Sequence, residues 1–273
     1  MPVLEILYPL IDPVAVWLGP LPIRWYALAY IAGLLGGWWY ARRLVAEDAL
    51  WGEDVRPSVA SLDDLLVYAA LGVVLGGRLG YVLFYNSDVF LSHPEEIVMV
   101  WKGGMSFHGG LVGAAFGVWL FSRRNHVPVL PVADLCSTVV PIGLLLGRVA
   151  NFIKPELWGR ASDVPWAMVF PDAGPLPRHP SQLYEAALEG ALLFVLLAIA
   201  VRAGALKRPG RVAGLFGVFY GLARIFCEFF REPDPQLGFL FGGATMGMLL
   251  SLPLILAGLL FLLASARREK APA

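Results

Sequence analysis

Long apolar segments alternate with short polar loops along the whole chain. A helix needs about 20 mostly apolar residues to cross a bilayer. Seven segments approach or exceed that length: residues 23–43, 64–85, 106–122, 132–153, 181–202, 212–230 and 240–265. The pattern predicts an all-α, polytopic integral membrane protein with about seven transmembrane helices, forming one domain over residues 1–273.

Composition and charge sharpen this prediction. Hydrophobic residues make up 58% of the chain, whereas soluble domains contain about 45–50%. Basic and acidic residues both number 21, so the net charge gives no reason to expect a nucleic-acid partner. Twelve basic residues lie in one set of loops and chain ends, six in the other set, and three inside apolar segments. By the positive-inside rule, the N-terminus and the loops 87–105, 154–180 and 231–239 face outward, and the C-terminus is cytoplasmic.

Three arginines, Arg78, Arg148 and Arg224, lie inside the apolar segments. Each ionised side chain at bilayer depth costs about 2.5–3.5 kcal/mol on insertion scales, so a functional role is the usual compensation. Arginine keeps its proton, and its planar fork matches phosphate oxygens. The sequence therefore predicts a membrane-embedded site for an anionic, phosphate-bearing molecule.

Two polar groups accompany these arginines near the predicted outer surface. Arg148 and Asn151 are three residues apart and share a helix face. Glu156, Gly159 and Arg160 follow in the outer loop. This group could hold a lipid headgroup, or Arg148 could merely anchor the end of a helix.

Tyr220, Arg224 and Glu228 recur every four residues and form a polar stripe, in which Arg224 and Glu228 can pair. Arg231 extends the stripe, seven residues after Arg224. This stripe could bind a ligand or form a structural ion pair between helices. A further stripe contains Glu185 and Glu189, which could neutralise the buried arginines.

His108 lies among glycines in the segment 103–110. It could act as a base, an acid or a phosphate donor, or it could simply be hydrogen-bonded. The four histidines show no metal-ligand spacing, and the chain has neither a P-loop nor a dinucleotide fingerprint. We therefore expect neither a metal site nor a cofactor.

Several motifs resemble the prolipoprotein diacylglyceryl transferase family of bacterial membrane enzymes. The matching stretches are residues 21–26, 76–86 (GGRLGYVLFYN), 101–110 (WKGGMSFHGG), 147–160 (GRVANFIKPELWGR), 179–189 (HPSQLYEAALE) and 220–238 (YGLARIFCEFFREPDPQLG). One position departs from the family pattern. The family usually has Asn, often followed by Gly, where this chain has Lys154 and Pro155.

The resemblance implies an enzyme that transfers the diacylglyceryl group of phosphatidylglycerol to the lipobox cysteine of a prolipoprotein signal peptide. A thioether forms and glycerol phosphate leaves. The implied location is the bacterial inner membrane, in contact with the lipid bilayer, with the active site on the periplasmic side. The positions that match the family suggest catalytic roles for Tyr26, His108, Arg148 and Arg224, and phosphatidylglycerol binding by Arg148, Asn151, Glu156, Gly159, Tyr220, Arg224 and Glu228.

Three other interpretations remain open from the sequence. A non-catalytic lipid or anion transporter would also need buried arginines, but would be expected to extend polar residues to the cytoplasmic face. A seven-helix receptor would normally carry a signalling domain or large loops. An inactive relative is the third, because of Lys154 and Pro155.

Overall fold

The computed structural model describes residues 6–52, 56–84, 93–100, 103–233 and 238–269. The parts of the motifs at residues 85–86, 101–102 and 234–237 lie outside these residues. The chain forms two compact units, one made of residues 1–41 and 134–273 and the other of residues 42–133.

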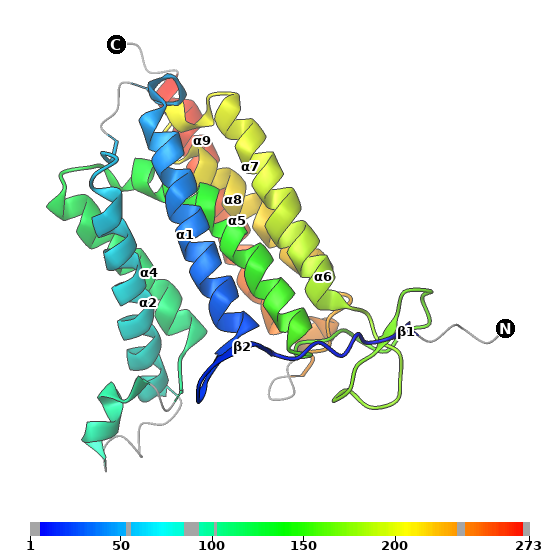
Figure 1. The fold of residues 1–273 in the computed structure, drawn as a ribbon. Coiled ribbons are helices and arrows are strands. Elements are labelled where there is room, and N and C mark those ends of the chain that lie inside the picture. The colour runs from blue at the N-terminus through cyan, green and yellow to red at the C-terminus, as the bar shows by residue number, and fades with distance from the viewer. Residues whose placement is uncertain (1–5, 53–55, 85–92, 101–102, 234–237, 270–273) are drawn as a thin grey trace. The chain divides into compact units, whose positions relative to one another are not determined.

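The first unit is a bundle of long helices whose axes are roughly aligned (Figure 1). Its helices are α1 (Trp25–Ala46, of which the last turn belongs to the second unit), α5 (Val129–Ile153, mostly in this unit), α6 (Ser181–Glu185), η4 (Ala186–Leu192), α7 (Leu193–Arg202), α8 (Arg211–Glu228) and α9 (Met246–Glu269). Helices α6, η4 and α7 are consecutive parts of one helix, and the short 3-10 turns η5 (Ala205–Lys207) and η6 (Phe241–Gly243) lie in loops.

Asp134 on α5 fixes the start of α8. Its side chain is fully buried, and its two carboxylate oxygens accept hydrogen bonds from the backbone nitrogens of Gly210 (2.6 Å) and Ala213 (2.7 Å). A carboxylate stabilises a helix N-terminus because it accepts from N–H groups that have no partner in the helix. This contact sets α8 against α5, the two helices that carry Arg224 and Arg148.

The second unit is built on two helices, α2 (Leu62–Phe84) and α4 (Phe107–Arg124), with the 3-10 turns η1 (Asp48–Leu50) and η2 (Pro94–Val98). Glycines let the two helix backbones approach closely, as small residues do in membrane helix pairs. A Cβ atom placed on Gly76 would lie 2.7 Å from the Cα of Gly113, and one on Gly113 would lie 2.9 Å from the Cα of Gly76. Larger residues at these positions would push the helices apart.

Short strands organise the start of the first unit and its 154–180 loop. Strands β2 (Val14–Leu18) and β3 (Leu21–Arg24) form an antiparallel hairpin, with Leu18 paired to Leu21. Strand β1 (Ile6–Leu7) pairs in parallel with β4 (Met168–Val169), in the register Ile6 to Met168. The adjacent Tyr8 hydroxyl hydrogen-bonds to the carbonyl oxygens of Phe152 (2.7 Å) and Ile153 (2.8 Å) at the end of α5. Residues 6–8 are thus attached both to the 154–180 loop and to α5.

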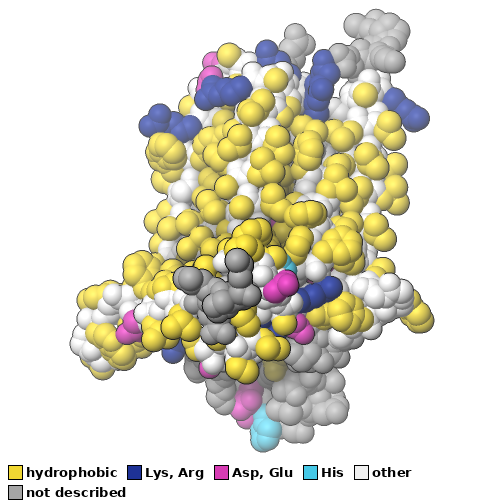
Figure 2. All heavy atoms as spheres, turned by 90° about the vertical axis from the view of Figure 1, so that its right-hand side faces the viewer, with side chains coloured by type: hydrophobic (Ala, Val, Ile, Leu, Met, Phe, Trp, Pro, Cys, Tyr) yellow, Lys and Arg dark blue, Asp and Glu magenta, His cyan; other side chains and the backbone are white. Residues whose placement is uncertain are grey.

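Each of the seven predicted segments overlaps a helix, and the chain is mostly helical with little sheet. Among the described residues, four helices are long and apolar enough to cross a membrane: Leu62–Phe84, Val129–Ile153, Ser181–Arg202 and Met246–Arg267. The total of seven spans and the orientation of the termini remain predictions. The outward faces of these helices are apolar: Leu192, Val195, Ile199, Leu252 and Leu256 are each 47–62% exposed. Figure 2 shows hydrophobic side chains across the middle of one face, with Lys and Arg side chains along its upper edge.

The structure differs from the prediction within the segment 181–202, because residues Ala186–Leu192 form a π-helix. The buried residues of this helix include Glu185, Glu189, Leu193 and Leu197, each four positions after the last. Four residues turn an α-helix by about 40° more than a full circle, so such a stripe drifts around it. The wider π turns offset this drift, which keeps the two glutamates and the two leucines buried.

Candidate active site

A cluster of buried charged side chains joins α5, the helix beginning at α6, and α8. Arg148 Nη1 lies 3.2 Å from Glu185 Oε2, and Arg148 Nη2 lies 3.3 Å from Glu189 Oε2. Arg224 contacts Glu185 and Glu228 through short ion pairs and lies 3.4 Å from Glu189. The prediction that Glu185 and Glu189 neutralise buried arginines is therefore confirmed for Arg148 and Arg224, as is the pairing of Arg224 with Glu228.

The cluster is almost closed to solvent and balanced in charge. Glu185 and Glu189 are fully buried, and Glu228 is 3% exposed. With Arg231, which lies 3.5 Å from Glu185, three guanidinium groups face three carboxylates. Balance matters because an unpaired ion in a low-dielectric interior is costly. The side chains of Arg148 and Arg224 keep 16% and 13% of their surface exposed, so neither side chain is fully buried.

The last turn of α5 adds a polar group beside Arg148. Asn151 is 6% exposed, and its side-chain nitrogen donates to Glu156 Oε1 over 2.8 Å. Lys154 pairs with the other oxygen of the same carboxylate over 2.6 Å. The lysine that departs from the family pattern is thus accommodated by Glu156, and Asn151 and Glu156 still contact each other.

The 154–180 loop contacts the C-terminal end of α8 mainly through backbone atoms. Arg160 donates from Nε to the carbonyl oxygen of Arg231 and from Nη2 to that of Glu228, both over 2.9 Å. Gly159 pairs with Arg231 in a β-bridge. A Cβ at Gly159 would lie 2.6 Å from the carbonyl oxygen of Phe230 and equally close to His179. Glycine is therefore required at position 159 so that the loop can approach α8.

The remaining predicted site residues of the first unit lie near helix ends or one turn from the cluster. Tyr220 lies one turn before Arg224 on α8, and its ring stacks on Phe216 with a centroid distance of 5.5 Å. Tyr26 opens α1 and lines a pocket of about 270 Å³ together with Arg24 and Lys154.

His108 and Arg78 belong to the second unit. His108 is exposed in the first turn of α4, a helix that the Ser106 side chain caps by accepting from the Gly109 backbone nitrogen over 3.2 Å. Arg78 is 5% exposed and donates to the carbonyl oxygens of Ile97 (2.8 Å) and Gly103 (2.6 Å). Arg78 therefore holds the segment that leads into α4 and His108.

The sequence placed Arg160 and Arg231 in the two polar groups but assigned neither of them to catalysis or lipid binding. Arg231 lies seven residues after Arg224 on the same helical face, and the structure places it 3.5 Å from Glu185. Arg160 acts through backbone carbonyl oxygens, and no sequence pattern reveals such partners. Among the described residues, no three His, Cys, Asp or Glu side chains lie together as a metal ion would require.

His179 predicts a dependence of stability on pH. Its Nδ1 lies 3.0 Å from the Tyr184 hydroxyl, and burial lowers its pKa below the ordinary value of 6.5. As the pH falls below 6.5, the unfolded chain takes up this proton before the folded protein does, so the free energy of unfolding should fall. We expect His179→Asn to show a smaller loss of thermal stability between pH 7.5 and pH 5 than the wild type. Parallel curves for the two proteins would contradict this role.

Fold and site together define a helical integral membrane protein with a neutralised cluster of arginines and glutamates inside its bundle. Residues 13–264 match the family model described as prolipoprotein diacylglyceryl transferase. The phosphatidylglycerol–prolipoprotein diacylglyceryl transferase of Methylocella silvestris is 70% identical over 268 residues, covering 98% of both chains. The enzymes of that name from Beijerinckia indica (67% identity, 96% of this chain and 97% of the relative) and Rhodopseudomonas palustris (59%, 100% and 96%) are also similar. The chain belongs to the prolipoprotein diacylglyceryl transferase family, and it is a transferase.

Proposed function

We propose that this protein transfers the sn-1,2-diacylglyceryl group of phosphatidylglycerol to the thiol of a lipobox cysteine in a prolipoprotein. The bond between the glyceryl carbon and the phosphate oxygen breaks, and its electron pair leaves with glycerol phosphate. The cysteine sulfur forms a thioether to the same carbon, and the thiol proton passes to a base. Family membership and the names of the relatives support this reaction and its two substrates.

The observation that carries the proposal is the pair of mostly buried arginine side chains, Arg148 and Arg224, which lie together in one cluster. Their ion pairs with Glu185, Glu189 and Glu228 fix their orientation. A guanidinium has five N–H donors, and the Nε–H of Arg148 is not used in these contacts. Preorganised donors of this kind stabilise negative charge that grows on a leaving group. In this proposal both arginines bind the phosphate.

The other residues of the cluster position the donor lipid. Asn151 and Glu156 lie beside Arg148 and offer amide and carboxylate groups to the glycerol headgroup. Gly159 lets the outer loop approach the end of α8. Tyr220 lies next to Arg224, Glu228 holds Arg224 in place, and Tyr26 faces its pocket at the start of α1.

We assign His108 to the acceptor side of the reaction. Thiolate, not thiol, is the nucleophile, and an imidazole can take the proton near neutral pH. If His108 is the base, the His108→Gln substitution should lower turnover by about 100-fold or more, which is within the usual range for general acid–base catalysis. The assay is transfer of labelled lipid to a lipobox peptide as a function of pH. Full turnover of His108→Gln with an unchanged pH profile would exclude His108 as the general base.

The proposed location is the bacterial inner membrane, with the active site toward the periplasm. The distribution of Lys and Arg supports this orientation through the positive-inside rule. Two single-cysteine variants test this orientation: Asp172→Cys in the 154–180 loop and Arg208→Cys between α7 and α8. Each is treated with a membrane-impermeant thiol reagent. Only the first should react in intact spheroplasts.

The deciding experiment incubates the purified protein with phosphatidylglycerol that carries a labelled acyl chain and with a lipobox peptide. Mass spectrometry should find the diacylglyceryl group on the peptide cysteine, together with free glycerol phosphate. The same peptide with serine in place of cysteine is the control. Movement of intact lipid between vesicles without any peptide modification would instead support the transporter alternative.

A further inference from the structure

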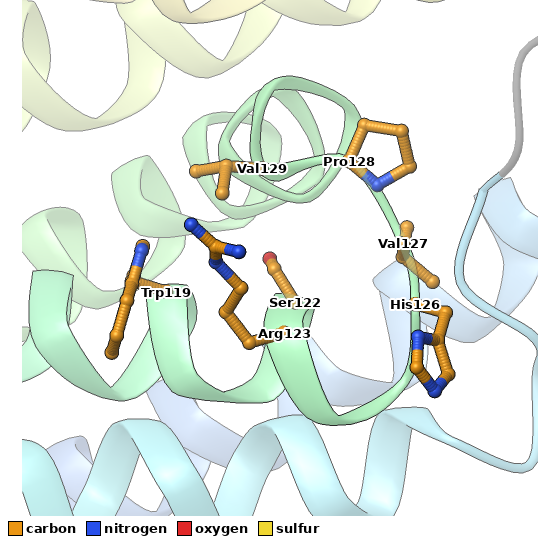
Figure 3. Close-up of a pocket in the computed structure, with 7 residues that line it drawn as sticks. All are labelled: Trp119, Ser122, Arg123, His126, Val127, Pro128 and Val129. Carbon is orange, nitrogen blue, oxygen red and sulfur yellow. The ribbon is translucent and has the colours of Figure 1, made fainter.

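A pocket of about 570 Å³ lies where α4 ends and α5 begins (Figure 3). It contains none of the residues assigned to transfer. The residues that line it come from the last turns of α4, the connecting loop and the start of α5: Trp119, Ser122, Arg123, His126, Val127, Pro128 and Val129.

The pocket carries positive charge. Arg123 is exposed, and no carboxylate pairs with it among the described residues. Its guanidinium packs over the ring of Trp119 at 5.5 Å. Val129 begins the 25-residue helix α5, whose first N–H groups have no partner within the helix and favour an anion. His126 also lines the pocket, with its ring away from Arg123 and Ser122 (Figure 3). Arg123 and the start of α5 together suit a phosphate.

A buried hydroxyl in the same pocket lacks a partner. Ser122 is 2% exposed, and its Oγ makes no hydrogen bond within the part of the chain that the structure describes. Buried polar groups are normally hydrogen-bonded, and each exception needs an explanation. Figure 3 shows this hydroxyl facing the space beside the Arg123 side chain. An anion that draws the flexible Arg123 side chain toward itself would give Ser122 an acceptor.

An exposed apolar stripe on α4 leads to the pocket. Val112, Phe116, Trp119 and Arg123 follow one another at intervals of four, three and four residues, which places them on one helix face. Val112, Phe116 and Trp119 are 69%, 59% and 41% exposed, and the rings of Phe116 and Trp119 stack at 5.4 Å. A free phosphate ion has no contact to make with this stripe, whereas an acyl chain does.

We propose that this pocket binds the phosphate of an anionic phospholipid whose acyl chains lie along the stripe of Val112, Phe116 and Trp119. Basic pockets at helix ends are known lipid headgroup sites on cytoplasmic surfaces, and the predicted orientation places this pocket there. The lipid at this site is bound and not consumed. It would stabilise the connection between α4 and α5.

The test uses the full chain in maltoside micelles, titrated with phosphatidylglycerol that carries brominated acyl chains. Bromine quenches tryptophan fluorescence on contact, and subtracting the signal of Trp119→Phe isolates Trp119. Work at about 0.3 M salt screens general attraction between exposed charges. We expect saturable quenching of Trp119, with binding at least tenfold weaker in Arg123→Gln because a charge-assisted hydrogen bond is lost. Arg124→Gln, the neighbouring exposed arginine outside the pocket, is the matched control and should bind like the wild type.

A second variant and a second ligand decide the remaining points. Ser122→Ala removes the unpartnered hydroxyl, so it should weaken lipid binding without lowering the stability of the lipid-free protein. Equal effects of Arg123→Gln and Arg124→Gln would overturn the site and leave only surface charge. Displacement of the lipid by millimolar inorganic phosphate would overturn the lipid assignment in favour of a free phosphate. The readout involves no turnover, so its failure is separate from failure of the proposed transfer reaction.

Discussion

Arg148→Lys should lower the rate of diacylglyceryl transfer by about 100-fold or more while leaving the protein folded. Lysine keeps the positive charge, so it can still pair with Glu185 and Glu189. It loses the planar fork that binds two phosphate oxygens at once. Losing one preorganised donor to a developing anion typically costs 100- to 1,000-fold in rate.

The measurement is steady-state transfer of labelled lipid to a lipobox peptide over a range of phosphatidylglycerol concentrations. If Arg148 stabilises the leaving phosphate, kcat should fall, whereas a role in binding alone would raise KM and spare kcat. Arg124→Lys is the control, because Arg124 is exposed at the other end of the predicted membrane helices. Near wild-type turnover in Arg148→Lys would refute the assigned role.

Glu185→Gln should be the most destabilising single change in the cluster. Glu185 is fully buried and contacts Arg148, Arg224 and Arg231. Without its charge, the cluster carries one uncompensated buried cation. Breaking a buried pair in this way costs about 3–5 kcal/mol. For a protein of this size, such a loss lowers the midpoint of thermal unfolding on the order of 10 °C.

Thermal unfolding in micelles tests this expectation, with Glu232→Gln as the matched control. Glu232 also pairs with an arginine, since it lies 3.0 Å from Arg178, but its side chain is 46% exposed. An exposed pair contributes less than about 1 kcal/mol, so this variant should unfold near the wild-type temperature. Similar shifts in both variants would show that the Glu185 cluster does not behave as a buried ionic network.

The helices were predictable because membrane helices need long apolar segments, and these are visible in one sequence. The boundaries of 132–153 and 181–202 agree with the structure to within a few residues. The pairing of Arg224 with Glu228 was also predictable, because residues four apart meet on a helix surface. Local spacing therefore revealed the stripes that make up the candidate site.

Contacts between helices were harder to predict from the sequence. Three arginines and three glutamates leave many possible pairings, and only the packing of α5, α6 and α8 selects those of Arg148 with Glu185 and Glu189. The bonds from Arg160 to backbone carbonyl oxygens leave no trace in the sequence, because every residue carries such an oxygen. The π-helix at Ala186–Leu192 was not predicted, because an apolar segment does not distinguish a π-helix from an α-helix.

The π-helix also makes the chain sensitive to length at this point. A π segment holds extra residues compared with the α-helical turns that it replaces. Deleting one residue from Ala186–Leu192 would allow a regular α-helix, and each residue subtends about 100° around such a helix. Glu185 would then rotate away from the arginines while Leu197 kept its packing. The number of residues in this segment is therefore as important to the cluster as the identity of Glu189 within it.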